Sequence, residues 1–580
     1  MKKLLVYLKS YKKETVLGPL FKLLEASFEL IVPLVVAAII DVGIGNGDKN
    51  YILRMCGVMV LLGVVGLISS ITAQYFAAKA ATGFATKLRH ALFEHIQSLS
   101  FSEIDQIGTA TMITRMTSDI NQLQSGVNMV LRLFLRSPFI VFGAMIMAFT
   151  IDVKAALVFV VTIPLLSVVV FGIMAISIPM YRKVQNSLDK ILSITRENLT
   201  GVRVIRAFGK ESSEISKFHD RNEDFTRFQT KVGRISALMN PVTYIIINLG
   251  IIVLVWGGAI RVNQGDITQG EVVALYNYMS QILVELIKLA NLIVTITKAL
   301  ACAGRIENIL EMKSSMPEEA QLLHKEVAQS EIKVAFEHVG MVYQGAAGEA
   351  LSDISFAVKQ GETIGIIGGT GSGKTTLVHL IPRFYDVSRG RVLVDGKDVK
   401  AYSLKELRQK VGIVMQKSVL FKGTIRENIC WGKEDATEDE IWEALETAQA
   451  KEIVTNKPEG LDTQVSQGAK NLSGGQKQRL SIARALVKKP EILILDDSAS
   501  ALDYATDARL RKAIAGLKNK MTVFIVSQRA SSIMHANKII VLDDGKIVGI
   551  GTHEELKKNC QVYQEIYYSQ YEKEGEHGEA

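Results

Sequence analysis

The stretch TIGIIGGTGSGKTT, residues 363–376, runs from an apolar β-type segment through a glycine-rich loop into the helix-forming segment LVHLIPRF. It fits the pattern G-x-x-x-x-G-K-[ST] through Gly368, Gly373, Lys374 and Thr375. Glycines let backbone N–H groups curl around phosphates, and the N-terminus of the following helix adds positive partial charge. The stretch therefore predicts a nucleotide-phosphate site in which Lys374 reaches the β- and γ-phosphates and Thr375 binds Mg²⁺. The expected cofactor-binding positions are Gly368, Gly369, Thr370, Gly371, Ser372, Gly373, Lys374, Thr375 and Thr376.

Around this loop, short β-type runs alternate with helical segments over residues 331–570. Strands that alternate with helices favour a largely parallel sheet, so we expect an α/β domain of the phosphate-loop type in this half. The runs expected to form strands are residues 332–339, 362–368, 391–396, 411–416, 492–497, 522–527 and 538–545.

The later stretch LILDDSASALD, residues 493–503, ends its apolar strand in two adjacent carboxylates, Asp496 and Asp497. An aspartate at a strand end is often only a turn former, but a phosphate loop upstream favours a metal-binding role. We therefore expect Asp496 to hold Mg²⁺, directly or through water, together with the Thr375 hydroxyl.

A second turn, NLSGGQKQRL at residues 471–480, precedes another helical segment. Ser473, Gly474, Gly475 and Gln476 form a second anion-binding helix start, which one nucleotide does not obviously need. A pair of such domains placed head to tail resolves this difficulty. Each nucleotide then lies between the phosphate loop of one domain and this turn of the other.

The first half of the chain is much more apolar than the second. Its longest uncharged runs exceed the about 20 apolar residues that cross a bilayer, and such runs are rare in the buried helices of soluble proteins, which are the alternative. We therefore expect an all-α membrane domain with six spans. The strong candidates are residues 55–78, 155–181 and 235–260, and the weaker ones are 17–40, 131–151 and 272–297.

The placement of lysine and arginine predicts the orientation of these spans. The N-terminal segment MKKLLVYLKSYKKE and the segments that follow the second and fourth spans are basic, whereas the alternate loops carry only Lys49, Lys154 and Arg261. The positive-inside rule then places both termini in the cytoplasm. The two long inward loops should be helical, with tips at residues 108–119 and 198–211.

Several charged residues fall inside the expected spans. Intramembrane ionisable groups usually face a cavity or a partner, which would make these residues substrate contacts. The alternative, which we favour, is local pairing at i,i+3 or i,i+4 spacing near a wet helix end. The residues are Lys22, Glu25, Glu29, Glu285 and Lys288.

These features divide the chain into a membrane domain at residues 1–312, a polar linker at 313–330 and a nucleotide-binding domain at 331–570. The charged segment 571–580 is expected to be a disordered tail. The four cysteines are far apart and lack metal-ligand spacing, so we interpret them as reduced thiols.

The phosphate loop, the LSGGQ turn and the strand LILDD, in this order, resemble the half-transporters of the ABC exporter superfamily. The resemblance extends over nearly all of the chain. It implies a six-helix membrane domain fused to an ABC ATPase domain, with ATP and Mg²⁺ as cofactors. It also implies that Tyr343 stacks on adenine, that Gln416 touches Mg²⁺ and senses the membrane domain, and that residues 500–503 contact the opposite site. The inward loop tips resemble the coupling helices that dock on the ATPase domains.

Two positions depart from the family pattern, which usually has glutamate at the position of Asp497 and histidine at that of Gln528. Aspartate is one methylene shorter, which reduces its reach by about 1.5 Å, and a misplacement of about 1 Å can lower a rate roughly a hundredfold. Gln528 can donate a hydrogen bond to a γ-phosphate but cannot carry the positive charge of histidine. We therefore expect the site of Lys374, Asp496, Asp497 and Gln528 to bind ATP but to hydrolyse it poorly.

The turn from Ser473 to Gln476 is nevertheless intact, and it would serve the opposite nucleotide. A partner chain with glutamate and histidine at the two departing positions would then complete one competent site. This pattern resembles the degenerate-site subunit of bacterial heterodimeric multidrug ABC exporters. The alternative is a homodimer in which Asp497 works well enough.

The resemblance implies ATP-driven export of amphipathic compounds, with drugs as the first candidates, across the cytoplasmic membrane. Lipid or peptide export is the alternative within transport, and an ATP-gated channel or regulatory membrane protein is a different class. A soluble DNA-repair or translation ATPase with the same motifs is opposed by the six spans. The expected partners are therefore a second half-transporter, a small amphipathic substrate and the lipid bilayer, and no nucleic acid.

Overall fold

The computed structural model describes residues 3–316, 331–498, 500–517 and 521–571. The chain forms two compact units, of which the first comprises Met1–Gln97 with Thr109–Met312 and the second Ser98–Gly108 with Lys313–Ala580. Most of the expected linker, residues 317–330, and nearly all of the expected tail, residues 572–580, lie outside the described residues.

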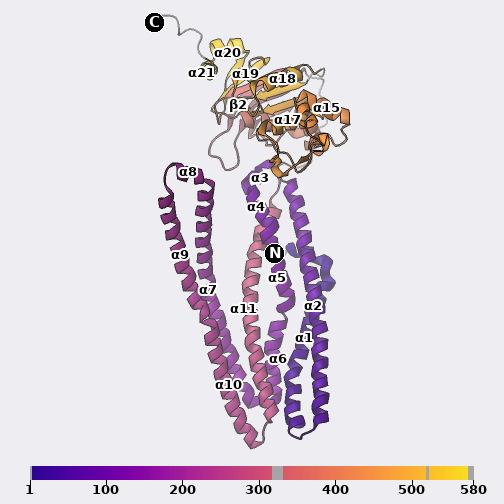
Figure 1. Ribbon diagram of the computed structural model, residues 1–580, viewed down its shortest axis with the longest axis vertical. Helices are drawn as coiled ribbons and strands as arrows, with labels where there is room; N and C mark the ends of the chain where they lie inside the picture. The colour runs from indigo at the N-terminus through magenta and orange to yellow at the C-terminus, as the bar shows by residue number, and fades with distance from the viewer. Residues whose placement is uncertain (1–2, 317–330, 499, 518–520, 572–580) are drawn as a thin grey trace. The chain divides into compact units, whose positions relative to one another are not determined.

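The first unit is built from long helices (Figure 1). Six helical stretches in the described residues are long and apolar enough to cross a membrane, which confirms the expected number of spans. They are Leu4–Ile44, Lys49–Ser98, Thr109–Ile151, Val153–Thr200, Glu211–Gln264 and Gln269–Glu311. The main helices within them are α1 (Lys12–Ala38), α2 (Lys49–Ser98), α4 (Thr109–Thr114), α5 (Ile120–Leu133), α6 (Arg136–Ile151), α7 (Val153–Thr200), α9 (Glu211–Ala237), α10 (Met239–Gln264) and α11 (Gln269–Glu311).

Small side chains let these helices approach one another closely. Ala26 of α1, Ala144 of α6 and Ala274 of α11 are fully buried in one cluster. Small residues favour close helix packing in membranes, where the lipid is as apolar as the helix surface. The hydroxyl of Tyr278 in α11 donates to the Leu30 carbonyl of α1 at 2.7 Å, which satisfies a buried polar group between the two helices. Large apolar side chains along α2, α7 and α10 remain exposed, as expected for lipid-facing surfaces.

The first inward loop differs from the expectation. The chain breaks at Ser98–Gly108 around the short helix α3 (Phe101–Ile107), and the expected tip at 108–119 lies mainly in the helical run that follows it. A capping box between Ser100 and Glu103 starts α3, because each side chain satisfies the backbone N–H of the other. The second tip is as expected, since α8 (Val202–Ala207) lies between the ends of α7 and α9.

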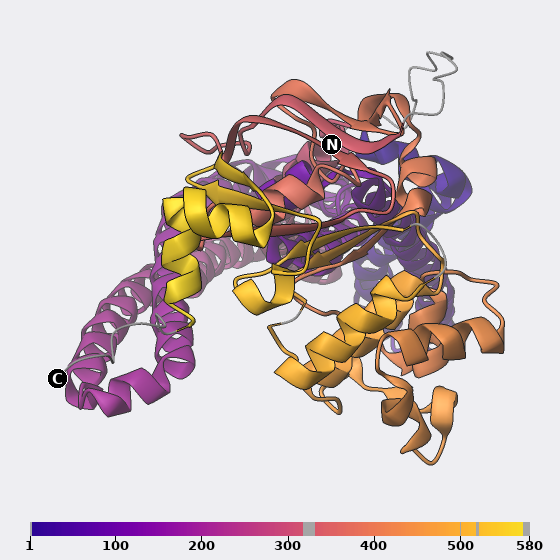
Figure 2. The ribbon, with the colours of Figure 1, turned by 90° about the horizontal axis from the view of Figure 1, so that it is seen from above.

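The second unit contains a six-stranded sheet in the order β12-β11-β3-β10-β9-β6 and a four-stranded sheet in the order β2-β1-β4-β5 (Figures 1 and 2). Every expected strand is present, but β2, β5 and β12 of these two sheets were not predicted. In the larger sheet only β12 is antiparallel, which confirms the parallel core, whereas the smaller sheet is antiparallel and was not expected. The strands are β1 (Ile332–Met341), β2 (Leu351–Lys359), β3 (Thr363–Gly368), β4 (Arg389–Val394), β5 (Lys397–Asp398), β6 (Val411–Val414), β9 (Ile492–Asp496), β10 (Thr522–Val526), β11 (Lys538–Asp543) and β12 (Lys546–Gly551).

Helices cover the sheets of this unit, and a two-stranded ribbon, β7 (Gly423–Thr424) with β8 (Gln464–Val465), completes it. The helices are α12 (Lys374–His379), α13 (Leu404–Lys410), α14 (Ile425–Cys430), α15 (Glu438–Thr447), α16 (Lys451–Thr455), α17 (Gly474–Leu486), α18 (Tyr504–Ala515), α19 (Ala530–Ile533), α20 (His553–Asn559) and α21 (Gln561–Tyr568). In Figure 2 the pink strands of the antiparallel sheet lie along one side of the unit and the orange helices lie on the other.

The parallel strands are apolar on both faces because both faces are covered. In β9, Ile492 and Ile494 belong to one core cluster while Leu493 and Leu495 belong to the other, as the alternation of side chains along a strand requires. The carboxyl ends of β3, β9 and β10 meet at one edge of the sheet. That edge therefore gathers the loops that follow these three strands, where α/β sheets bind their ligands.

Candidate functional site

A cavity of about 310 Å³ opens at this edge of the sheet. It brings together most of the residues singled out in the sequence, although they come from distant segments. Its walls are Tyr343, Thr370, Gly371, Ser372, Gly373, Lys374, Thr375, Thr376, Gln416, Asp496, Asp497 and Gln528, together with Ala350, Val526 and Ser527.

The phosphate loop places Lys374 inside this cavity. Its Nζ donates to the carbonyls of Gly368 and Gly369 at 2.8 and 2.5 Å. Burial lowers the pKa of the Lys374 amine from its usual value. A Cβ on Gly373, whose φ is +91°, would lie 2.7 Å from the Ala350 carbonyl, so this position needs glycine for both space and backbone conformation. The loop thus holds a cation against a turn of backbone, as a phosphate site requires.

Thr375 and Asp496 form a pair that suits Mg²⁺. The Thr375 hydroxyl donates to Asp496 Oδ1 at 3.0 Å, and Asp496 is only 1% exposed. The other carboxylate oxygen, Oδ2, has no hydrogen-bond partner among the described residues, and a buried charged oxygen without a partner is unfavourable. Oxygen donors are the ligands that Mg²⁺ prefers, so Thr375 and Asp496 could hold this ion, which would neutralise charge on nucleotide phosphates.

His379 is a neighbour of this pair that the sequence analysis did not single out. It follows Thr375 by four residues on α12, so the two side chains share a helix face. His379 Nε2 lies 3.6 Å from Asp496 Oδ2, and its ring packs on Phe384 with centroids 5.4 Å apart. The i,i+4 spacing from Thr375 was a signal that could have identified it.

Asp497 adopts a backbone conformation that is unusual for a residue with a side chain. Its φ is +46°, and its N–H donates to the Val526 carbonyl at 3.0 Å, which holds the turn after β9 in place. Gln416 Nε2 donates to Asp497 Oδ2 at 3.3 Å, and burial raises the pKa of the Asp497 carboxyl. Gln528 lines the same cavity, and its backbone carbonyl accepts from Gln570 at 2.7 Å. The two departures from the family pattern therefore line the same cavity as Lys374.

The signature turn lies apart from this cavity. Ser473 caps α17 by accepting from the Gln476 N–H at 3.3 Å, and the Gln476 side chain accepts from the Ser473 N–H at 2.9 Å. Within the described part of the chain, none of the four residues from Ser473 to Gln476 lines the cavity around Lys374. A Cβ built on Gly474 meets open space, so the start of this helix is accessible to a group from outside the chain.

A series of contacts joins α3 to the cavity within the second unit. The Tyr385 hydroxyl donates to Asp105 of α3 at 2.7 Å, and burial together with this carboxylate raises the pKa of Tyr385. The Tyr385 ring packs edge-on against Tyr343 with centroids 5.1 Å apart, and the Tyr343 hydroxyl lies 3.0 Å from the Thr376 hydroxyl. Phe101 of α3 also packs on the neighbouring Phe384 ring. Asp105 and Tyr385 carry no local signal in the sequence, since only the tertiary fold brings them together.

Comparisons with known proteins agree with this architecture. Residues 15–286 match the family described as ABC transporter transmembrane region, and residues 351–500 match the family described as ABC transporter. A bacterial Atm1-family ABC exporter with ATP bound has the same fold, with a TM-score of 0.79 at 24% sequence identity over 97% of this chain and 99% of the other.

Related sequences match over almost the whole length. The uncharacterized ABC transporter ATP-binding protein YfiB of Bacillus subtilis is 37% identical over 99% of both chains. The putative multidrug export ATP-binding/permease protein YgaD of the same organism is 33% identical over 98% of both chains. A fatty acid ABC transporter ATP-binding/permease protein of Mycobacterium bovis is 33% identical over 83% of this chain and 75% of its own length. The chain therefore belongs to the ABC transporter family, as an exporter-type half-transporter with its membrane domain fused in front of its ATPase domain.

Proposed function

We propose that this chain is one half of a heterodimeric exporter that uses ATP to move amphipathic compounds out across the cytoplasmic membrane. ABC exporters work as dimers, and the ATPase domain implies that ATP drives the transport. In this proposal the chain contributes a weak ATP site and donates its signature turn to the competent site of its partner. ATP closes the paired ATPase domains, and this closure switches the membrane helices from inward-facing to outward-facing.

The observation that carries the proposal is the pair Asp497 and Gln528 beside Lys374. The Asp497 carboxylate is one methylene shorter than glutamate, and Gln416 already binds one of its oxygens. Gln528 supplies no positive charge for a developing negative charge on the phosphate. Lys374, Thr375 and Asp496 still suffice to hold ATP with Mg²⁺, so this site would keep its ability to bind ATP while hydrolysing it slowly.

The intact turn from Ser473 to Gln476 supports the unequal division between the two chains. In a homodimer, both nucleotides would meet a complete signature turn opposite a weak set of catalytic residues. In a heterodimer, the partner would provide the glutamate and the histidine, and this chain would provide the turn. Each motif then has a use.

Contacts from α3 supply a route by which the state of the nucleotide could reach the membrane helices. In this proposal Tyr343 stacks on adenine; its ring packs against Tyr385, and the Tyr385 hydroxyl donates to Asp105 of α3. Movement of the Tyr343 ring on nucleotide binding would therefore displace α3 through Tyr385 and Asp105. Gln416 would contact Mg²⁺ in the same cavity and so link the metal site to the membrane domain.

The relatives favour amphipathic cargo but differ on its class. YgaD is named a putative multidrug exporter, and the mycobacterial relative is named a fatty acid transporter. Export of drugs is the first candidate function for this chain, and export of lipids is the second.

Purified alone in lipid nanodiscs, the chain is expected to bind ATP with Mg²⁺ but to hydrolyse it slowly. The double substitution Asp497→Glu with Gln528→His should raise this hydrolysis by about tenfold or more, because placement errors of about 1 Å already change rates by roughly a hundredfold. Phosphate release measures the turnover, and a fluorescent ATP analogue measures binding.

The matched control is Asp497→Asn, which removes the carboxylate without changing the size of the side chain. It should leave the slow turnover almost unchanged. Brisk turnover by the chain alone that Asp497→Asn abolishes, while binding of the analogue persists, would overturn the heterodimer proposal. The reading frame that neighbours this one in the genome is the first place to look for the partner.

A further inference from the structure

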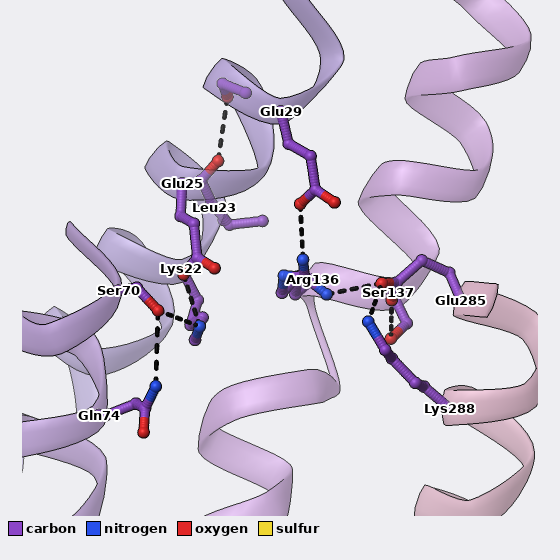
Figure 3. A network of polar contacts seen from close by, with 11 residues as sticks. Lys22, Leu23, Glu25, Glu29, Ser70, Gln74, Arg136, Ser137, Glu285 and Lys288 are labelled. Carbon is purple, nitrogen blue, oxygen red and sulfur yellow. Dashed lines mark hydrogen bonds and ion pairs between the residues drawn. The ribbon is translucent and has the colours of Figure 1, made fainter. Parts of the chain in front are cut away.

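A connected group of charged side chains lies inside the membrane unit, at the junction of α1, α6 and α11 (Figure 3). Figure 3 shows Arg136 of α6 between two carboxylates, Glu29 of α1 and Glu285 of α11. Its Nη1 donates to Glu285 Oε1 at 2.6 Å, and its Nη2 donates to Glu29 Oε2 at 2.6 Å. One arginine thus joins three helices.

Glu285 accepts hydrogen bonds from three protein donors through both of its oxygens. Its Oε1 also accepts from Lys288 Nζ at 2.8 Å, and its Oε2 accepts from the Ser137 hydroxyl at 2.7 Å. The side chains of Arg136 and Glu285 are only 8% and 3% exposed. They form the buried, neutral base of the group, because a buried charge is tolerated when it is paired and hydrogen-bonded.

Glu29 and Lys288 differ from this pair because they keep free capacity. Their side chains are 40% and 41% exposed, and each contacts the buried base once: a single Glu29 oxygen binds Arg136, and the Lys288 ammonium binds Glu285. Glu29 can therefore accept another hydrogen bond, and the Lys288 ammonium, which has three donors, can give two more. The exposed part of the group presents one negative and one positive charge.

Both residues line a cavity of about 460 Å³ between α1 and α11. The α1 wall continues from Glu29 with apolar residues at helical spacing, and the α11 wall carries polar residues at the same kind of spacing. The side-chain oxygen of Gln281 is buried without a hydrogen-bond partner in the described part of the chain. On α1 the apolar residues are Val32, Pro33 and Val36; on α11 the polar residues are Asn277, Ser280 and Gln281, and Val284 is apolar.

We propose that this cavity binds a zwitterionic amphipath, with its cationic group on Glu29, its anionic group on Lys288 and its apolar tail along Val32, Pro33 and Val36. This assignment rests on the proposed export function and names the chemical class of the cargo. The donor groups of such a ligand could also satisfy the Gln281 oxygen.

Charge balance selects this class over singly charged compounds. Arg136 and Lys288 carry two positive charges, and Glu29 and Glu285 carry two negative charges, so the group is neutral before a ligand arrives. A singly charged ligand would leave a net charge in a medium of low dielectric constant, which is strongly unfavourable. A ligand whose own charges cancel keeps the cavity neutral while pairing both exposed residues.

The test measures binding without nucleotide, with the full-length chain in nanodiscs. A fluorescent phosphocholine with a dodecyl chain is displaced by dodecylphosphocholine, dodecyltrimethylammonium or dodecyl phosphate, all far below micelle-forming concentrations. The zwitterion should bind at least about tenfold more tightly than the other two, which equals about 1.4 kcal/mol. Equal displacement by all three compounds, or a preference for the cation or the anion, would overturn the proposal.

Two variants locate the site. Glu29→Gln and Lys288→Gln should each weaken binding of the phosphocholine about tenfold, while the melting temperature stays close to that of the parent because Arg136 and Glu285 remain paired. Glu223→Gln on α9, an exposed carboxylate that pairs with the exposed Arg227 at 3.3 Å, is the matched control and should leave binding of the phosphocholine unchanged. Unchanged binding in both cavity variants would overturn the assignment.

Two further competition measurements distinguish a membrane lipid from a soluble compound as the source of the ligand. Nanodiscs rich in phosphatidylethanolamine should compete with the probe if the cargo is a membrane lipid, whereas a soluble amphipathic peptide with zwitterionic ends should compete if it is not. Because no ATP is present, slow or absent hydrolysis would leave this result intact. Active export without any headgroup selectivity would contradict only the cavity assignment.

Discussion

Replacing Ser473 with alanine is expected to lower the ATP turnover of the assembled heterodimer by about a hundredfold. In the proposed heterodimer, the Ser473 hydroxyl and the N-terminus of α17 would face the γ-phosphate held by the partner, in the site that is proposed to hydrolyse well. Loss of one preorganised donor at a developing charge typically lowers the turnover rate by about 10²–10³-fold. Phosphate release from the purified pair in nanodiscs measures the effect.

The chain supplies a matched control for this substitution. Thr437 caps α15 with the same geometry, accepting from the Glu440 N–H at 3.3 Å in a second capping box. Thr437→Ala and Ser473→Ala each remove a cap worth about 1 kcal/mol of stability. Turnover should fall only for Ser473→Ala. Equal turnover in the two variants would mean that the signature turn acts only as a helix cap, and the head-to-tail arrangement would be contradicted.

The phosphate loop and the strands around it were predictable because their signals are local. Residues 363–376 contain a strand, a loop and a helix start within one stretch, and glycine spacing restricts what the loop can do. The run ILIL at residues 492–495 is apolar at every position, which is typical of a strand covered on both faces, and the structure places it inside the sheet as β9, between β10 and β6. Here local sequence and tertiary structure agree.

The antiparallel sheet was not predicted because its signal depends on pairing. The segment of β2, LSDISFAVK, is only partly buried, and its polar residues hide a strand pattern. Its stability comes from β1, which lies beside it in the sheet. A strand defined by its neighbour cannot be recognised from its own composition.

The charged group in the membrane unit was predicted only in part. Local pairing was the favoured interpretation, and the i,i+3 pairs Lys22–Glu25 and Glu285–Lys288 are both present. Arg136 was not predicted, because it lies 149 residues from Glu285 in the sequence. Its hydrogen bond to Glu285 is nevertheless shorter than that of Lys288, 2.6 Å against 2.8 Å. A contact over that separation leaves no periodic pattern in the sequence. The pairing interpretation was therefore correct for the helices taken singly and incomplete for their assembly.

Arg136→Gln is expected to be the most destabilising single substitution in the membrane unit. It would leave the buried Glu285 with Lys288 and Ser137 and would remove the ion pair between Arg136 and Glu29. Removing one partner of a buried ion pair typically lowers stability by about 3–5 kcal/mol. The melting temperature of the chain in nanodiscs, followed by tryptophan fluorescence or by protease resistance, should drop accordingly.

The double substitution Arg136→Met with Glu285→Leu separates ionic pairing from packing. Replacing both members of a buried pair by apolar residues is often neutral or stabilising, whereas removing one member leaves a charge without its partner. The double variant should therefore recover most of the stability that Arg136→Gln loses, and it leaves the group neutral because Glu29 and Lys288 still carry opposite charges. A double variant that melts as early as Arg136→Gln would show that shape rather than charge holds α6 against α11. Arg136 joins three helices, so its loss should also loosen the α1 wall of the cavity.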